Sequence, residues 1–204
     1  MPKETKVQIT DSERLQALLD QYKDSFKYLT GYLKTRERLF LIVLIVVVGM
    51  FLDFTAIVDS SSVVSQIAKK SLGVKVILSP KIVSTMFWFV LLSTVVRYFQ
   101  ATILVERQYP YIHQLEKEIS VIAGDSFHRE GRAYLENYPF FSKWTWALYT
   151  IVFPAILSLA AIVKAYNEFQ IRDILAANYY LNCVFFLMLL VSIVLYIMQI
   201  HFKK

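Results

Sequence analysis

The sequence predicts an all-α integral membrane protein with four transmembrane helices, a cytoplasmic N-terminal amphipathic helix and a helical cytoplasmic middle loop. Four apolar stretches with few or no internal charges carry this prediction: 39–58, 82–104, 144–163 and 179–200. About 20 helical residues cross a hydrocarbon core of roughly 30 Å. Composition supports the prediction, because 56% of the 204 residues are hydrophobic and the mean hydropathy is +0.47.

An amphipathic arm, 1–38, precedes the first span. Thr10 and Glu13 have the spacing of a capping box, so we predict a helix that begins near Asp11 and runs through Arg38 into the first span. Its apolar residues recur at alternating spacings of four and three: Leu15, Leu19, Tyr22, Phe26, Leu29 and Leu33. Such a stripe requires a partner, which is the chain's own cytoplasmic loop, a second subunit or the membrane surface.

The four spans form two predicted hairpins. The first, 39–104, contains the spans 39–58 and 82–104, and Ser79-Pro80 is typical of the start of a helix. The second, 144–200, contains the spans 144–163 and 179–200 joined by a loop from Lys164 to Asn178, with a tail at 201–204. No segment has the composition of a cleavable signal peptide, so we expect the first span to remain in the mature protein.

The distribution of basic residues predicts the orientation. The arm, the segment 105–143 and the tail carry 15 lysines and arginines, whereas the two loops on the opposite side carry six. The positive-inside rule then places both termini and the middle loop in the cytoplasm. Much of the net charge of +6 lies beside the spans and is explained by anionic lipid head groups, so we expect no nucleic-acid partner.

The middle loop, 105–143, reads as two amphipathic helices. Beyond Glu106, one face carries Ile112, Leu115, Ile119 and Ile122, which predicts that the second span extends past the bilayer and ends at Gly124. A second helix would then place Phe127, Gly131, Tyr134 and Tyr138 on one face before Pro139 turns the chain. We expect these helices and the arm to pack beneath the membrane.

Three segments of this region resemble the RipA family of octameric bacterial inner-membrane proteins: 111–116 (YIHQLE), 127–134 (FHREGRAY) and 138–144 (YPFFSKW). The resemblance implies a bacterial inner-membrane homo-octamer with no established enzymatic activity. The candidate assembly or partner motif comprises Tyr111, His113, Leu115, Glu116, Phe127, Arg129, Glu130, Gly131, Tyr134, Tyr138 and Pro139. The four-span plan is also similar to membrane accessory proteins of RNA-targeting CRISPR systems and to other small defence proteins.

Catalysis and metal binding have little support in the sequence. Arg107 and His113 form an R-x5-H arrangement that resembles the ribonuclease signature of HEPN domains, but Pro110 lies between them and one such pair arises easily by chance. The three histidines lack the paired spacing of metal ligands, and Cys183 is the single cysteine. We therefore expect a protein that is not an enzyme and that holds no cofactor or metal.

Polar residues inside the spans are candidates for a pore or a helix contact. Asp53 lies about 21 Å from the cytoplasmic edge of its span and Arg97 about 10 Å from that edge, so a direct ion pair between them is disfavoured. Arg97 is expected to extend toward lipid phosphates, whereas Asp53 would reach the outer interface or form a ring in an oligomer. Asn182 is a third candidate.

These observations favour a homo-oligomeric scaffold or regulatory protein of the inner membrane, whose cytoplasmic helices mediate assembly or bind a cytoplasmic protein partner. The alternative is an oligomeric ion channel or a membrane-perturbing effector of a phage-defence or CRISPR-associated system. A chain with four spans is too small to enclose a wide pore alone, so conduction would require assembly around a symmetry axis.

Overall fold

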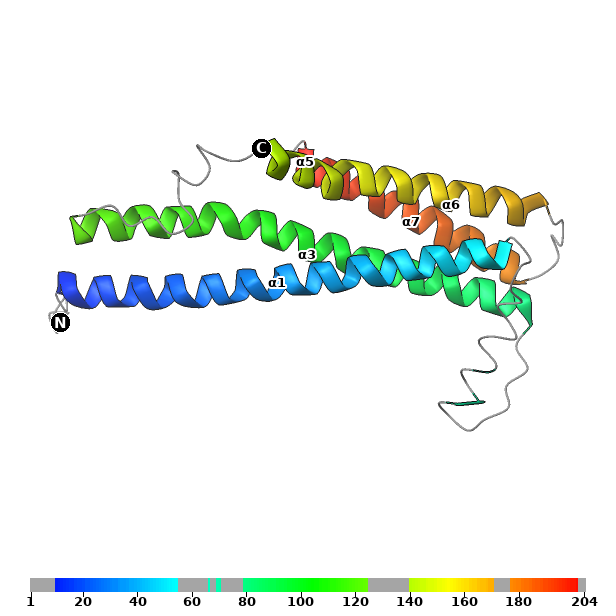
Figure 1. Cartoon of the computed structure of the whole chain (residues 1–204), viewed down its shortest axis with the longest axis horizontal. Coiled ribbons are helices and arrows are strands. Elements are labelled where there is room, and N and C mark those ends of the chain that lie inside the picture. The colour runs from blue at the N-terminus through cyan, green and yellow to red at the C-terminus, as the bar shows by residue number, and fades with distance from the viewer. Residues whose placement is uncertain are drawn as a thin grey trace, which may run out of the picture. The chain divides into compact units, whose positions relative to one another are not determined.

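The computed structural model describes residues 10–54, 66, 69–70, 79–124, 140–170 and 177–201, and these residues are almost entirely helical (Figure 1). The elements are α1 (Asp11–Phe54), α3 (Pro80–Ala123), α5 (Phe140–Ala147), the π-helical η1 (Leu148–Val152), α6 (Phe153–Gln170) and α7 (Ala177–His201). The predicted all-helical class is therefore confirmed for the described residues.

Three helical segments of the described chain are long and apolar enough to cross a membrane: Pro80–Ala123, Trp144–Gln170 and Ala177–Ile200. The predicted first span is not among them. Its described part, 39–54, is shorter than the 18 residues needed, and extending it backward includes Arg38 and Glu37. Residues 55–58 of that predicted span lie outside the described residues.

The surfaces of these helices are apolar where the protein does not cover them. Only 17% of the most apolar stretch of α7 is buried, and 28% of the corresponding stretch from Trp144 to Gln170. The exposed side chains of α7 include Leu187, Val191 and Leu195. Contiguous apolar surface of this kind is costly in water and is solvated by lipid. The three helices thus indicate a multi-pass membrane protein.

The chain divides into two compact units. Residues 1–34 and 101–143 form the hairpin unit, and residues 35–100 and 144–204 form the membrane unit. Helices α1 and α3 each contribute one part to each unit.

The hairpin unit is built on an antiparallel pair of helical segments, the first half of α1 and the second half of α3 (Figure 1). Its core consists of Tyr22, Leu29, Val105, Ile112, Leu115 and Ile119, with Leu15, Leu18, Tyr32, Leu33 and Tyr109 packed against it. Of the three partners considered for the arm, the described structure therefore shows the chain's own loop. The predicted extension of the second span beyond residue 104 is also confirmed.

One position of the predicted stripe is wrong. Leu19 is 38% exposed, and Leu18 packs against the core in its place. Phe26 is half-buried and stacks on Tyr22. The buried residue at this turn is its neighbour Ser25. The inward face thus follows residues 15, 18, 22, 25, 29 and 32, with Leu33 also packed against the core. It keeps a 3.5-residue repeat but lies one position before the predicted stripe at 18, 25 and 32.

Both ends of the hairpin unit's described helices were predicted correctly. Thr10 donates from its backbone nitrogen and its hydroxyl to the Glu13 carboxylate at 2.9 and 2.8 Å, and α1 begins at Asp11. At the other end, α3 stops at Ala123 because Gly124 adopts a φ of 69°, a left-handed conformation that favours glycine.

The Glu13 cap makes the start of α1 sensitive to pH. The backbone and hydroxyl hydrogen bonds from Thr10 lower the pKa of Glu13 below its ordinary value of 4.5. A carboxyl whose folded pKa is depressed stabilises the helix above its ordinary pKa, and this contribution is lost as the pH falls through the lowered value. We expect the first turns of α1 to lose protection against hydrogen exchange as the pH falls through this acidic range. In a Glu13→Gln variant, the protection of the same amides should not change over this range.

The membrane unit is held together by close helix contacts and an aromatic core. A side chain added at Gly49 would come within 3.1 Å of the Phe87 ring, so glycine permits the close approach of α1 to α3 there. Phe40 packs on Phe153 and Tyr149 at ring-centroid distances of 4.8 and 5.3 Å, and Phe99 stacks on Tyr196 at 4.0 Å. The aromatic core thus joins α1, α3, α7 and the third predicted span.

A π-helical turn, Leu148–Val152, interrupts the third predicted span just before Pro154. Phe153 donates its backbone N–H to the carbonyl of Leu148, five residues earlier. Proline has no N–H and its ring clashes with the carbonyl four residues before it, which accounts for a wider turn at this place. A π-helical turn thus accommodates Pro154 in this span.

Candidate functional site

A buried polar cluster lies within the membrane unit around the carboxylate of Glu168 on α6. We call it the Glu168 cluster; its members are Ser84 and Trp88 on α3, Lys164 and Glu168 on α6, and Asn182 on α7. Lys164, Ser84 and Asn182 are each at least nine-tenths buried, and Trp88 is 1% exposed. Ionisable side chains in helices of this hydropathy are rare, and they mark candidate functional sites.

Four donors converge on the single carboxylate. Ser84 and the Lys164 ammonium contact Oε1, the latter at 3.2 Å. The Trp88 indole and the Asn182 amide donate to Oε2 at 2.9 and 3.0 Å. A carboxylate offers about four lone-pair positions, so these donors fill them. The arrangement therefore joins three helices through one anion and leaves that anion little capacity for a metal or a substrate.

The cluster lies toward one end of each of its helices. Glu168 is two residues from the end of α6, Asn182 five residues from the start of α7, and Ser84 four residues from the start of α3. Trp88 and Phe186 pack edge to face with ring centroids 5.9 Å apart, and Phe169 contacts Phe186, so aromatic rings flank the cluster. The cluster thus joins the C-terminal part of α6 to the N-terminal parts of α3 and α7.

The sequence prediction missed Lys164 and Glu168 because it assigned Lys164–Asn178 to a loop. In the structure α6 continues to Gln170, and Lys164 is buried. The sequence did contain a signal, because Lys164 and Glu168 are four residues apart. A lysine–glutamate pair at this spacing is compatible with a helix that continues past Lys164. The prediction counted Lys164 only as an external positive charge, and the donors from α3 lie about 80 residues away in sequence.

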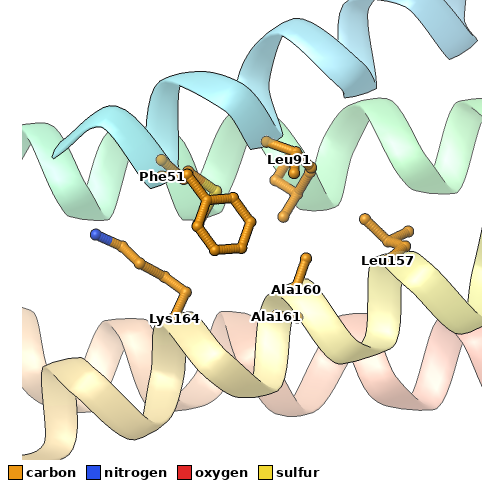
Figure 2. Close-up of a pocket in the computed structure, with 8 residues that line it drawn as sticks. Phe51, Leu91, Leu157, Ala160, Ala161 and Lys164 are labelled. Atoms are coloured by element: carbon orange, nitrogen blue, oxygen red, sulfur yellow. The ribbon is translucent and has the colours of Figure 1, made fainter. Parts of the chain in front are cut away.

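Lys164 also closes an apolar pocket of the membrane unit. Figure 2 shows Lys164 among the residues that line this pocket, which include Phe51 of α1, Leu91 of α3 and the α6 residues Leu157, Ala160 and Ala161. The aliphatic stem of Lys164 lines this pocket while its ammonium pairs with Glu168. One side chain thus serves an apolar contact and a polar one, as long cationic side chains often do.

The three predicted intramembrane residues have different positions. Asn182 joins the Glu168 cluster. Arg97 is exposed on α3, which is compatible with the expected extension toward lipid phosphates. Asp53 is helical, one residue before the end of α1, and its side chain lies outside the description. Of the side chains that the structure describes, Asn182 is thus the predicted intramembrane residue that belongs to the Glu168 cluster.

The first four residues of the predicted cytoplasmic motif lie on α3 in the hairpin unit. Leu115 belongs to the core, and Glu116 is buried and accepts a hydrogen bond from the Tyr22 hydroxyl at 3.2 Å. Tyr111 is exposed and accepts from the Gln21 amide, whereas His113 is half-buried near the ring of Tyr109. The remaining motif residues lie outside the described residues: Phe127, Arg129, Glu130, Gly131, Tyr134, Tyr138 and Pro139.

The R-x5-H pair lies on one continuous helix. Arg107 is exposed and His113 half-buried, and six residues of α-helix separate their directions by about 120°. The two side chains thus leave different faces of α3, which runs through Pro110 without a break. Nothing in this placement brings them together within one subunit.

Comparison with protein-family models, with curated proteins and with solved structures finds no match for this chain. The class of protein therefore follows from the fold and the site alone: the described residues are almost entirely helical, and three long apolar helices among them indicate several membrane crossings. The resemblance to the RipA family stays a prediction.

Proposed function

We propose that this protein is a homo-oligomeric scaffold of the bacterial inner membrane, with both termini in the cytoplasm, whose hairpin unit mediates assembly or partner contact. Eight subunits are expected from the RipA resemblance. The observation that carries the proposal is the pair of helices that leave the membrane unit and continue into a packed hairpin unit.

Helices α1 and α3 contain more residues than a membrane crossing requires. Helices α1 and α3 have 44 residues each, which correspond to roughly 66 Å at 1.5 Å per residue. The hydrocarbon core is about 30 Å thick, so each helix must extend well past it. Because the extended parts pack through a core that includes Leu29 and Ile112, they form an ordered structure that is suited to contact other proteins.

One flank of the hairpin unit has the character of a protein contact surface. We call it the assembly flank; it consists of Gln21 and Tyr28 on α1 and Leu104 and Tyr111 on α3, all exposed. Residues seven apart share a helix face, and the Gln21–Tyr111 hydrogen bond joins the two helices on this flank. Tyr28 is 65% exposed and Tyr111 38%. Exposed tyrosines are enriched in protein interfaces.

Tyr28→Glu is expected to weaken the oligomer. A glutamate in place of a tyrosine anchor loses its apolar contact and buries a charge, so subunit affinity should fall by about 30-fold or more. Light scattering of the detergent-solubilised protein during size-exclusion chromatography measures the change in mass.

Gln16→Glu is the matched control, because it introduces the same charge at an exposed position about 120° around α1 from Tyr28. It should leave the oligomer mass unchanged. An unchanged mass for Tyr28→Glu in a folded protein would contradict assembly through this flank, and a monomeric wild type would contradict the scaffold itself.

A second candidate function, an oligomeric ion channel, is favoured by the ionisable groups of the apolar helices, Arg97 on α3 and the Lys164–Glu168 pair on α6. Planar-bilayer recordings of the wild type, Asp53→Ala and Glu168→Gln distinguish the two functions. Reproducible currents altered by either substitution would favour the channel, and a silent oligomer would favour the scaffold.

A further inference from the structure

Arg36 on α1 is a cation without an anionic partner among the described residues. It is half-buried, and its Nε atom is buried without a hydrogen-bond acceptor there. Its guanidinium carbon lies 5.0 Å from the centroid of the Tyr149 ring, and both residues belong to the membrane unit. A guanidinium whose Nε is withdrawn from water in this way usually binds a carboxylate or a phosphate.

The ring beneath Arg36 is held in place from two sides. Phe40 packs edge to face on Tyr149 at 5.3 Å, and the Tyr149 backbone carbonyl accepts a hydrogen bond from the Tyr98 hydroxyl at 3.3 Å. Tyr149 also lies in the π-helical turn Leu148–Val152. The cation–π contact therefore orients the guanidinium on a rigid aromatic support, so binding an anion costs little additional side-chain order.

The position of Arg36 along the helix places it at head-group depth. It precedes the apolar stretch that starts at Leu39 by less than one turn. On the facing segment, Trp144 and Trp146 are 51% and 41% exposed just before Tyr149, and exposed tryptophans concentrate at membrane interfaces. An anion at this depth is a lipid phosphate, and cytoplasmic leaflets are rich in anionic lipids.

We propose that Arg36, supported by Tyr149, is a binding site for the phosphate of an anionic phospholipid, one lipid per subunit. The planar fork of arginine donates two parallel hydrogen bonds to phosphate oxygens, which an ammonium does not reproduce. This site does not depend on the number of subunits or on the scaffold function. It gives the protein a preference for a charged lipid at a fixed position.

Native mass spectrometry of the full chain in a neutral detergent, titrated with phosphatidylglycerol or phosphatidylcholine, tests the site. We expect the wild type to retain one phosphatidylglycerol per subunit and to prefer it over phosphatidylcholine. Arg36→Gln should weaken phosphatidylglycerol binding by about 10- to 100-fold, as the loss of charge-assisted hydrogen bonds implies. Arg36→Lys should lose part of this affinity because the fork is absent.

Arg38→Gln is the matched control, since it removes the same charge from an exposed side chain two residues further along α1. Equal losses from Arg36→Gln and Arg38→Gln would show diffuse charge attraction and overturn the proposal. Tyr149→Leu keeps the arginine and removes its support, so it serves as a second variant if Arg36→Gln fails to fold; unchanged lipid binding there would also count against the site. Displacement of the lipid by millimolar inorganic phosphate would overturn lipid specificity.

Discussion

Replacing Glu168 by leucine is expected to lower the free energy of unfolding of the membrane unit by about 3–5 kcal/mol. The substitution leaves the buried Lys164 ammonium without its counter-ion at 3.2 Å and deprives Trp88 and Asn182 of their acceptor. Removing one member of a buried ion pair is costly, because it does not remove the desolvation of the other member. Thermal and denaturant unfolding of the protein in mild detergent measures the loss.

The two charged partners should behave differently. Lys164→Met leaves Glu168 with its donors Ser84, Trp88 and Asn182, so we expect a smaller loss of about 1–3 kcal/mol. The double variant removes both charges and should be more stable than Glu168→Leu alone. Asn167→Ala is the control on the same helix, because the Asn167 side chain donates to the Val163 carbonyl of α6 itself. It should change stability by about 0.5 kcal/mol or less.

An equal loss for Glu168→Leu and Lys164→Met would show that the two charges act as a simple pair and that the other donors contribute little. If neither substitution changes stability, the Glu168 cluster does not hold α3, α6 and α7 together. This second result would leave the ionisable groups of the apolar helices without a structural role, and the channel candidate would then gain support.

The Glu168 cluster could not be predicted from the sequence. Hydropathy identified the apolar stretch of α6 because side-chain chemistry alone decides whether a stretch suits lipid. The same method placed Lys164 in a loop, because a charge next to an apolar stretch usually marks its end. Only the three-dimensional arrangement brings Trp88 and Asn182, from helices far apart in sequence, to the carboxylate that makes a buried lysine tolerable.

The helix ends of the hairpin unit were more predictable, because they are determined by residues that are close in sequence. Thr10 and Glu13 indicated the start of α1, and Gly124 indicated the end of α3, since caps depend on residues within one turn. The inward face was predicted less accurately, because Leu18 and Leu19 are both leucine and equally suited to a helix. Which of them faces α3 depends on the crossing of two helices, and periodicity within one helix cannot determine it.

Leu29→Ala is expected to destabilise the hairpin unit by about 2–5 kcal/mol. Leu29 is 2% exposed and belongs to the core with Ile112 and Ile119, so truncation leaves a cavity between the two helices. Hydrogen exchange of the amides between residues 11 and 34 reports this unit separately from the membrane unit. Their protection should fall to that of a largely open helix.

Leu19→Ala provides the comparison that separates the observed inward face from the one predicted by periodicity. Leu19 is 38% exposed, so its truncation should cost less than about 1 kcal/mol, although alternating spacing placed it in the same stripe as Leu29. Leu18→Ala should give the larger effect of the two, because Leu18 packs against the core. Equal sensitivity at positions 18 and 19 would mean that a further surface, such as another subunit, covers Leu19 in the assembled protein.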